Sequence, residues 1–195
     1  MAMAKYGPAI VMGALAGIAM FFLMKTLVFP DGPAAAAYGL GTGIFFAYIL
    51  ANLAGNRKEV LANSDQRREA LQFQPPPGKA QLVVCRDGFV GRLAGLNLAV
   101  DGRPFGQIKS PRFTSVTLAP GQHTLTCAFG GLAGPQSRAG SYAFEAMPGR
   151  ATVVKIGAQM GLVQGSFQFT PMDDLAAAKA KLDYVPMIPA DVVEV

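Results

Sequence analysis

The side chains that could carry chemistry are few: one histidine, His123, and two cysteines, Cys85 and Cys127. A histidine can act as a general acid or base, and a thiolate can attack a carbonyl or bind a metal. His123 follows a turn and shares a strand face with Leu125 and Cys127, so we expect it to be packed or hydrogen-bonded rather than catalytic. One histidine makes no histidine-based metal cluster, and the cysteines lack CxxC spacing.

The remaining candidates also have structural explanations. Asp173 and Asp174 stand where a helix is predicted to begin, and acids there are stabilised by the helix dipole. Gly130-Gly131, Gly134 and Gly140 form a loose loop between two predicted strands, whereas phosphate-binding glycine loops lead into a helix. No GxSxG or HExxH signature occurs. The sequence therefore predicts a protein that is not an enzyme, with no cofactor and no bound metal.

Composition separates an apolar start from a more polar remainder. Hydrophobic residues make up 51% and charged residues 15% of the 195 residues, and the apolar excess lies before residue 56. This is more apolar than an ordinary soluble domain. The net charge of +5 is mild, and no run of basic residues interleaved with aromatic ones occurs. We therefore expect no binding to nucleic acid.

Two apolar runs at the start of the chain organise the rest. The first is uncharged from Tyr6 to Met24, the second is uncharged from Ala34 to Ala54, and a short turn separates them. Each run is close to the roughly 20 residues that a transmembrane helix needs. We therefore predict a transmembrane helical hairpin over residues 1–55, with the lipid bilayer as its first partner. A cleaved signal peptide is the rival interpretation, disfavoured because the second run follows at once.

Basic residues predict the orientation of this hairpin. Those outside the turn are Lys5, Arg57, Lys58, Arg67 and Arg68. The turn carries only Asp31, and Lys25 is the one basic residue near it. The positive-inside rule then puts both termini, and the domain that follows, in the cytoplasm. The Ala-, Gly- and Arg-rich style indicates a bacterial source, so the predicted location is the bacterial inner membrane.

Small residues recur every four positions in both runs. They are Ala9, Gly13 and Gly17 in the first run, and Gly39, Gly43, Ala47, Ala51 and Gly55 in the second. Such spacing lets helix backbones approach closely in lipid. We expect the two series to pack against each other within the hairpin. The alternative is that the longer series, or the bulky aromatic face, meets another membrane protein. The residues of that face are Phe21, Phe22, Phe45, Phe46 and Tyr48.

Residues 56–78 connect the hairpin to the rest of the chain. Residues 56–73 lack Gly and Pro and are rich in helix formers, so we expect a juxtamembrane helix, which the Pro75–Gly78 run ends as a stiff spacer. The basic side chains of this helix are Arg57, Lys58, Arg67 and Arg68. They suit anionic headgroups, so we expect them to contact the membrane surface. A solvated spacer helix is the alternative.

From Lys79 the pattern changes to two-residue alternation with frequent turns, which is typical of a small antiparallel β domain. The predicted strands span residues 80–86, 96–100, 104–108, 112–118, 122–129, 141–147, 151–156 and 163–169. Eight short strands are enough for a two-layer β-sandwich over residues 79–170. Whether Cys85 and Cys127 lie on neighbouring strands stays open at this point.

Residues 171–195 are expected to form a short helix and an extended tail. Thr170 is a suitable N-cap, Pro171 suits the first helical position, and residues 175–182 are rich in Ala and Lys. The apolar ends of the tail suggest that it adds a strand to a partner's sheet edge. The predicted fold class is an α+β membrane protein that combines a helical hairpin, an antiparallel β-sandwich and a short C-terminal helix.

Several short motifs of the β region occur in one order. They are Val100-Asp101-Gly102, Gly106, Leu118–Thr124, Val153–Gly157 and Met160-Gly161. Over about residues 80–182 the chain resembles a bacterial, membrane-tethered family of domains of unknown function with a PEGA-like β domain, whose pattern is VDG…PGxHT…KxGxxxG. The resemblance implies a small non-enzymatic β domain on a tethered chain. Here a two-helix hairpin replaces the family's lipid anchor, which suggests a cytoplasmic setting.

The leading functional hypothesis is a non-enzymatic, membrane-anchored accessory or structural subunit. Its hairpin would dock on other integral membrane protein subunits, and its β domain would brace the cytoplasmic face of that complex. The alternative is a membrane-tethered module that binds or senses a ligand or peptide through its loops, notably Phe129–Ser141. A hydrolase or redox enzyme that depends on His123 or Cys85 is the third reading, and it lacks a supporting motif.

Overall fold

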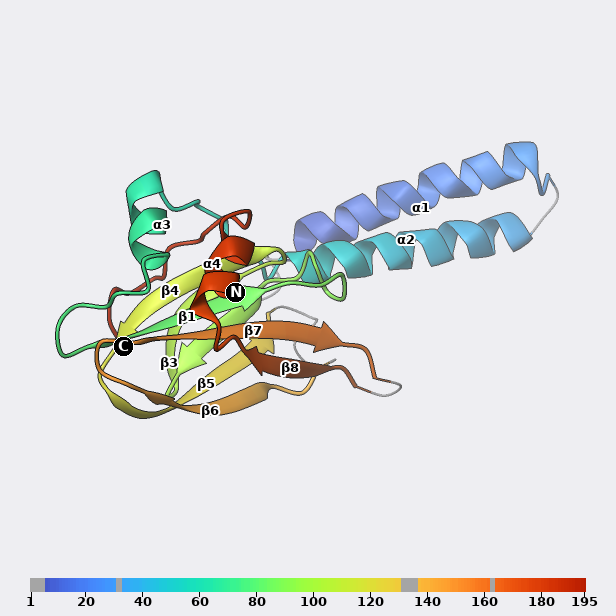
Figure 1. The fold of residues 1–195 in the computed structure, drawn as a ribbon. Helices are drawn as coiled ribbons and strands as arrows, with labels where there is room; N and C mark the ends of the chain where they lie inside the picture. The colour runs from blue at the N-terminus through green and yellow to red at the C-terminus, as the bar shows by residue number, and fades with distance from the viewer. Residues whose placement is uncertain (1–5, 31–32, 131–136, 162–163) are drawn as a thin grey trace. The chain divides into compact units, whose positions relative to one another are not determined.

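The computed structural model describes residues 6–30, 33–130, 137–161 and 164–195 (Figure 1). The chain divides into two compact units, Met1–Asn56 and Arg57–Val195, which we call the hairpin and the β unit. Some sequence predictions fall outside the described residues. These are Lys5, the turn at Asp31-Gly32, the loop glycines Gly131 and Gly134, and the predicted strand start at Val163.

The hairpin consists of α1 (Gly7–Leu27) and α2 (Pro33–Leu53), each 21 residues long. At 1.5 Å per residue this gives about 31 Å, so both helices are long and apolar enough to cross a bilayer. Proline stands in the first turn of each helix, where no backbone N–H is needed. Bulky apolar side chains point outward along both helices, among them Leu15, Phe22, Leu40, Ile44 and Phe45.

Within its described residues, the β unit contains eight strands in two four-stranded sheets. The strands are β1 (Ala80–Arg86), β2 (Leu96–Val100), β3 (Arg103–Ile108), β4 (Arg112–Leu118), β5 (Gly121–Phe129), β6 (Gly140–Ala146), β7 (Ala151–Gln159) and β8 (Ser166–Pro171). Their order is β4-β1-β7-β8 in the first sheet and β3-β2-β5-β6 in the second. The number of strands and most of their bounds agree with the alternation in the sequence.

The prediction of a purely antiparallel sandwich was wrong for one pair of strands. β1 and β7 run parallel, with Val83 opposite Val153, although all the other strand pairs are antiparallel. A parallel neighbour must come from a distant part of the chain, because a tight turn joins only antiparallel strands. Alternation of apolar residues carries no information about that choice.

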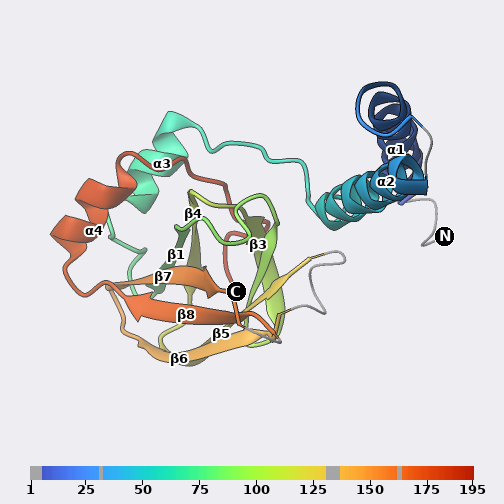
Figure 2. The ribbon, with the colours of Figure 1, turned by 90° about the vertical axis from the view of Figure 1, so that its right-hand side faces the viewer.

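The first sheet is buried on both faces. One face packs against the second sheet around Leu82, Val84 and Phe105. The other face, with Val83 and Cys85, is covered by α3 (Ser64–Ala70), α4 (Leu175–Leu182) and the tail. Figure 2 shows this three-layer arrangement. Double burial explains why every residue of β1 is buried and why its middle, Leu82–Cys85, is an unbroken apolar run.

The predicted helix over residues 56–73 was wrong in extent, because only Ser64–Ala70 is helical. Asn63 begins the helix through a capping box, in which its side chain accepts a hydrogen bond from Gln66 N–H and the Gln66 side-chain oxygen accepts one from Asn63 N–H. The preceding residues are extended along the β unit, where Ala62 N–H donates to the Met187 carbonyl at 2.9 Å. These tertiary contacts override the helix propensity of the segment.

The start of the C-terminal helix was also placed wrongly. Thr170 and Pro171 end strand β8, and the N-cap is Asp174, whose carboxylate accepts hydrogen bonds from the backbone of Ala176 and Ala177. Met172 N–H donates to the Val153 carbonyl, which keeps the segment paired with β7 beyond the strand end. Strand pairing with β7 therefore extends through Thr170 and Pro171, so the helix begins later than these two residues predicted.

The tail covers an edge of the protein's own sheet. Phe113 on edge strand β4 donates to the Pro186 carbonyl and accepts from Ile188 N–H, and Thr117 makes the same pair of bonds with Val193 and Val195. The expectation that the tail is available to a partner's sheet edge is therefore wrong for this structure. The first sheet had an open edge, and the tail satisfies its backbone groups.

Candidate functional site

The two helices of the hairpin meet through their small residues. A Cβ atom at Gly17 would lie 2.7 Å from the Gly39 carbonyl oxygen, and one at Gly39 would lie 2.7 Å from the Cβ of Phe21. A Cβ at Gly13 would lie 2.5 Å from the Cβ of Ala47 and 2.7 Å from the Gly43 carbonyl oxygen. Any larger side chain at these glycines pushes the helices apart, so their absence of a Cβ sets the spacing.

The other members of the two series are less uniform. Ala9 and Ala51 are buried, whereas Gly55 lies beyond the end of α2. Ala35 is also fully buried, and it was not among the predicted packing residues. It stands four residues before Gly39, so the same spacing rule would have found it.

A groove opens along one side of this helix pair. Its volume is about 550 Å³, and it is lined by α1 and α2 residues that are almost all apolar. Gly17, Gly39 and Gly43 line it together with the bulky side chains of Ile18 and Ile44. A groove of this kind suits an apolar side chain or helix ridge, because its lining is apolar and can make van der Waals contact with such a group.

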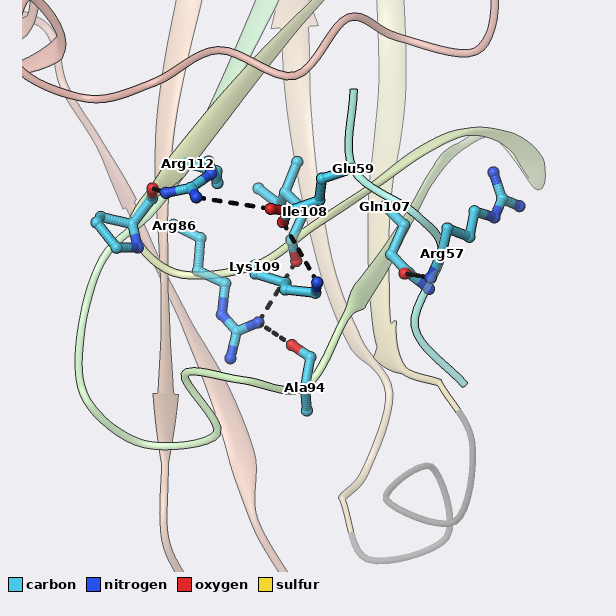
Figure 3. A network of polar contacts seen from close by, with 9 residues as sticks. Arg57, Glu59, Arg86, Ala94, Gln107, Ile108, Lys109 and Arg112 are labelled. Atoms are coloured by element: carbon cyan, nitrogen blue, oxygen red, sulfur yellow. Dashed lines mark hydrogen bonds and ion pairs between the residues drawn. The ribbon is translucent and has the colours of Figure 1, made fainter. Parts of the chain in front are cut away.

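The segment after the hairpin is docked on the β unit. Arg57 N–H donates to the Gln107 side-chain carbonyl at 2.7 Å, and the Arg57 guanidinium pairs with Asp191 in the tail. Glu59 lies within 3.8 Å of the Lys109 ammonium and 3.5 Å of the Arg112 guanidinium (Figure 3). The side chain of Glu59 is only 21% exposed, so this carboxylate is shielded from water between two cations.

The basic residues expected at a membrane surface are mostly engaged within the β unit. Besides the pairing of Arg57, the Arg67 guanidinium donates to the backbone carbonyls of Leu182 and Asp183 at the end of α4. Arg68 pairs with Asp65 on its own helix at 2.7 Å and is exposed. Among the described contacts, Lys58 makes no hydrogen bond or ion pair.

The C-terminal tail is linked at several points to the chain between the hairpin and β1. We call residues 56–78 of this chain the connector. Asp191 N–H donates to the Phe105 carbonyl of β3, while its side chain pairs with Arg57. Glu194 pairs with Lys79 just before β1. Because the tail also bonds β4, it joins one edge strand from each sheet to the segment that follows the hairpin.

Arg86 is the most unusual side chain of the β unit. It is only 2% exposed, and its guanidinium donates to the carbonyls of Ala94 and Gly91 at 2.6 Å and of Val90 at 3.3 Å. The central carbon of its guanidinium group, Cζ, also lies 5.0 Å from the centre of the Phe129 ring. No carboxylate among the described residues pairs with it, and burial lowers the pKa of this group to about 10. Arg86 therefore holds the β1–β2 loop through carbonyls rather than a salt bridge.

His123 is committed to local structure. Its Nδ1 lies 2.6 Å from the Asp101 carboxylate, and its Nε2 lies 2.8 Å from the Ala119 carbonyl oxygen. Asp101 also accepts a hydrogen bond from Thr124 N–H. This hydrogen bond and, after it, the contact with His123 lower the pKa of Asp101. Asp101 has a φ of 50°, so these bonds hold a left-handed turn before β3.

The two cysteines do not meet. Cys85 lies on β1 under the helices, and Cys127 lies on β5 of the other sheet, between the two sheets. Burial raises the pKa of the Cys85 thiol to about 11 and that of Cys127 to about 12. Both thiols are therefore protonated at neutral pH and act as small apolar side chains.

Within the described ranges, no group of three or more potential metal ligands comes together. The loop Phe129–Ser141 was predicted to take part in ligand recognition. It lies only partly within the described residues. Comparison of the chain with protein-family models and with curated proteins gives no match.

Proposed function

We propose that this protein is a non-enzymatic, membrane-anchored accessory or structural subunit of a larger integral membrane complex. The observation that carries the proposal is the hairpin itself. Two long apolar helices pack through glycines, and yet they leave bulky side chains such as Phe22, Leu40 and Phe45 exposed on their outer surface. An outer surface of this kind is suited to lipid or to the apolar helices of another protein.

The groove of the hairpin is the proposed contact for a transmembrane helix of the partner subunit. Its lining is apolar, and its walls present Ile18 and Ile44 to the incoming side chains. The proposed setting is the bacterial inner membrane, with both termini and the β unit on the cytoplasmic side. The basic residues after α2 favour that orientation.

The docked connector supports a bracing role for the β unit. Only Ala54–Asn56 separates the end of α2 from Arg57, which already bonds Gln107 and Asp191. A short tether allows a rigid domain to hold a defined place next to the membrane complex, unlike a domain on a long flexible linker. No reaction is needed for this role.

The groove can be tested with two matched variants of the tagged chain, purified from native membranes in mild detergent. Ala14 lines the groove, whereas Ala19 is exposed on α1 outside the groove. Ala14→Leu fills the groove and is expected to reduce the co-purified partner subunits several-fold. Ala19→Leu adds the same volume and is expected to leave them unchanged. Equal recovery with both variants would contradict docking through this groove.

A ligand- or peptide-binding module is the second candidate. A cleft of about 240 Å³ lies between α3, β4 and the tail, and it is lined by Gln66, Gln81, Ser115 and Val193 among others. The absence of any thermal shift with peptide and metabolite collections would count against this alternative.

A further inference from the structure

The loop between β1 and β2 presents apolar side chains to the outside of the β unit. Phe89 is 86% exposed and Leu93 is 65% exposed, and the exposed Arg92 lies between them in sequence. A phenyl ring and a leucine side chain exposed on one loop are costly in water, and their exposure points to a partner for that surface.

The loop is held in place rather than left loose. Arg86 binds the carbonyls of Val90, Gly91 and Ala94, as described above. Within the loop Arg92 N–H donates to the Phe89 carbonyl at 3.1 Å. Ser110 of the neighbouring β3–β4 loop donates its hydroxyl to the Gly88 carbonyl at 2.8 Å and its N–H to the Arg92 carbonyl. The apolar side chains are therefore presented on a fixed support.

This support is part of the surface on which the connector docks. Gln107 at the end of β3 binds Arg57, and Lys109 in the following loop pairs with Glu59. Lys109 is thus bound to the connector, and the next residue, Ser110, is bound to the β1–β2 loop. The attachment point of the hairpin and the loop with Phe89 are consequently carried by the same end of the β unit.

The tether that joins this end to α2 in the chain is short. Three residues, Ala54–Asn56, span at most about 11 Å when fully extended. If α2 crosses the bilayer, this chain length keeps the surface around Gln107 within reach of the headgroups. The exposed Met160, which follows β7 parallel to β1, adds a third apolar side chain at this end.

We propose that the β1–β2 loop inserts Phe89 and Leu93 into the boundary between headgroups and acyl chains of the bilayer that anchors the protein. The proposal rests on the membrane anchor of the proposed function. Phenylalanine and leucine suit this boundary, and the exposed Arg92 and Lys58 suit anionic headgroups. The β unit is then held by two points, the tether and the loop, which fixes its tilt on the membrane.

The chain contains no tryptophan, so a single introduced tryptophan reports on its own surroundings. Phe89→Trp is placed in the full-length chain, which is reconstituted into vesicles of brominated phosphatidylcholine and phosphatidylglycerol. The matched control is Met147→Trp, because Met147 follows β6 at the opposite end of the sandwich and is 45% exposed. Phe22→Trp, on the outer surface of α1, reports on the anchor.

The expected result is strong quenching and a blue-shifted emission for Phe89→Trp, with at least a threefold greater loss of intensity than for Met147→Trp. Phe22→Trp is expected to be quenched as well. If Phe22→Trp is quenched and Phe89→Trp resembles Met147→Trp, the loop does not enter the bilayer and this inference is overturned. If Phe22→Trp is not quenched, the membrane anchor of the proposed function is overturned.

Discussion

Arg57 and Asp191 lie 134 positions apart in the chain and form an ion pair at the surface of the β unit. Arg57 is the first residue after the hairpin, and Asp191 lies in the C-terminal tail. Both side chains are about half exposed, so the pair by itself contributes little to stability. Its importance is geometric, because it shows where the connector and the tail meet over the β3 and β4 edges.

Glu59 is expected to contribute more than the exposed pairs. Glu59→Ala leaves the half-buried Lys109 and Arg112 without their carboxylate, so the free energy of unfolding of the β unit should fall by about 1–2 kcal/mol. Arg68→Ala, which removes an exposed pair on α3, should change it by less than about 0.5 kcal/mol. Urea unfolding of the full chain in detergent measures both. Equal effects would show that the buried carboxylate has no special role.

Arg86 is expected to be essential for the β1–β2 loop. Arg86→Met removes the donors for Ala94, Gly91 and Val90, and the loss should be about 3 kcal/mol or more. Arg86→Lys should restore little, because an ammonium group cannot reach several carbonyls as a guanidinium fork does. The exposed Arg92→Ala is the control, with an expected change below about 0.5 kcal/mol. Full rescue by lysine would contradict the proposed geometry.

The buried thiols predict a specific pH dependence. Because the pKa values of Cys85 and Cys127 are raised to about 11 and about 12, the folded state keeps protons that the unfolded chain releases near pH 8.5. Their contribution to stability is complete below about pH 8.5 and is lost as the pH rises toward 11. A variant with both cysteines replaced by alanine should show a flatter stability profile over this range.

The same thiols should react with iodoacetamide only after unfolding. At pH 8 alkylation in the native protein is expected to be at least tenfold slower than in urea, and no disulfide should form between them because they lie in different sheets. Rapid alkylation of the native chain would show that one of the two sites opens readily.

The glycines between the helices predict a sharp contrast within α2. Gly39→Leu introduces atoms where the Cβ alone would lie 2.7 Å from Phe21, so the helices must separate. Gly41→Leu is the control, since nothing lies within 4 Å of a Cβ there. In detergent, the aggregation temperature of the Gly39 variant should fall by several degrees, whereas that of the Gly41 variant should stay near the original value. A similar fall in both would place the helix contact elsewhere.

Local patterns predicted much of the fold. The uncharged runs predicted both helices of the hairpin, and alternation with glycine turns predicted eight strands whose bounds are mostly within two residues of the observed ones. Both signals depend on neighbouring residues alone. The Gly17 and Gly39 contact was also accessible, because a four-residue spacing puts small side chains on one helix face.

Long-range choices could not be predicted in the same way. Nothing near Arg57 in sequence indicates that it binds Gln107 and Asp191, because a basic residue after an apolar helix suits a headgroup equally well. The parallel pairing of β1 with β7 and the folding of the tail onto β4 likewise depend on residues far apart. Arg86 had no visible signal, since its partners are backbone carbonyls that every sequence contains.

The size of the native particle tests most directly whether this chain is a subunit of a larger membrane complex. The tagged chain, 20.4 kDa, is extracted from its own membranes in mild detergent and examined by size-exclusion chromatography with light scattering and mass spectrometry. For a subunit of a larger complex we expect a protein mass several times that of the chain, with other integral membrane subunits present in fixed stoichiometry. A protein mass equal to that of the single chain, with no other subunit present, would contradict it.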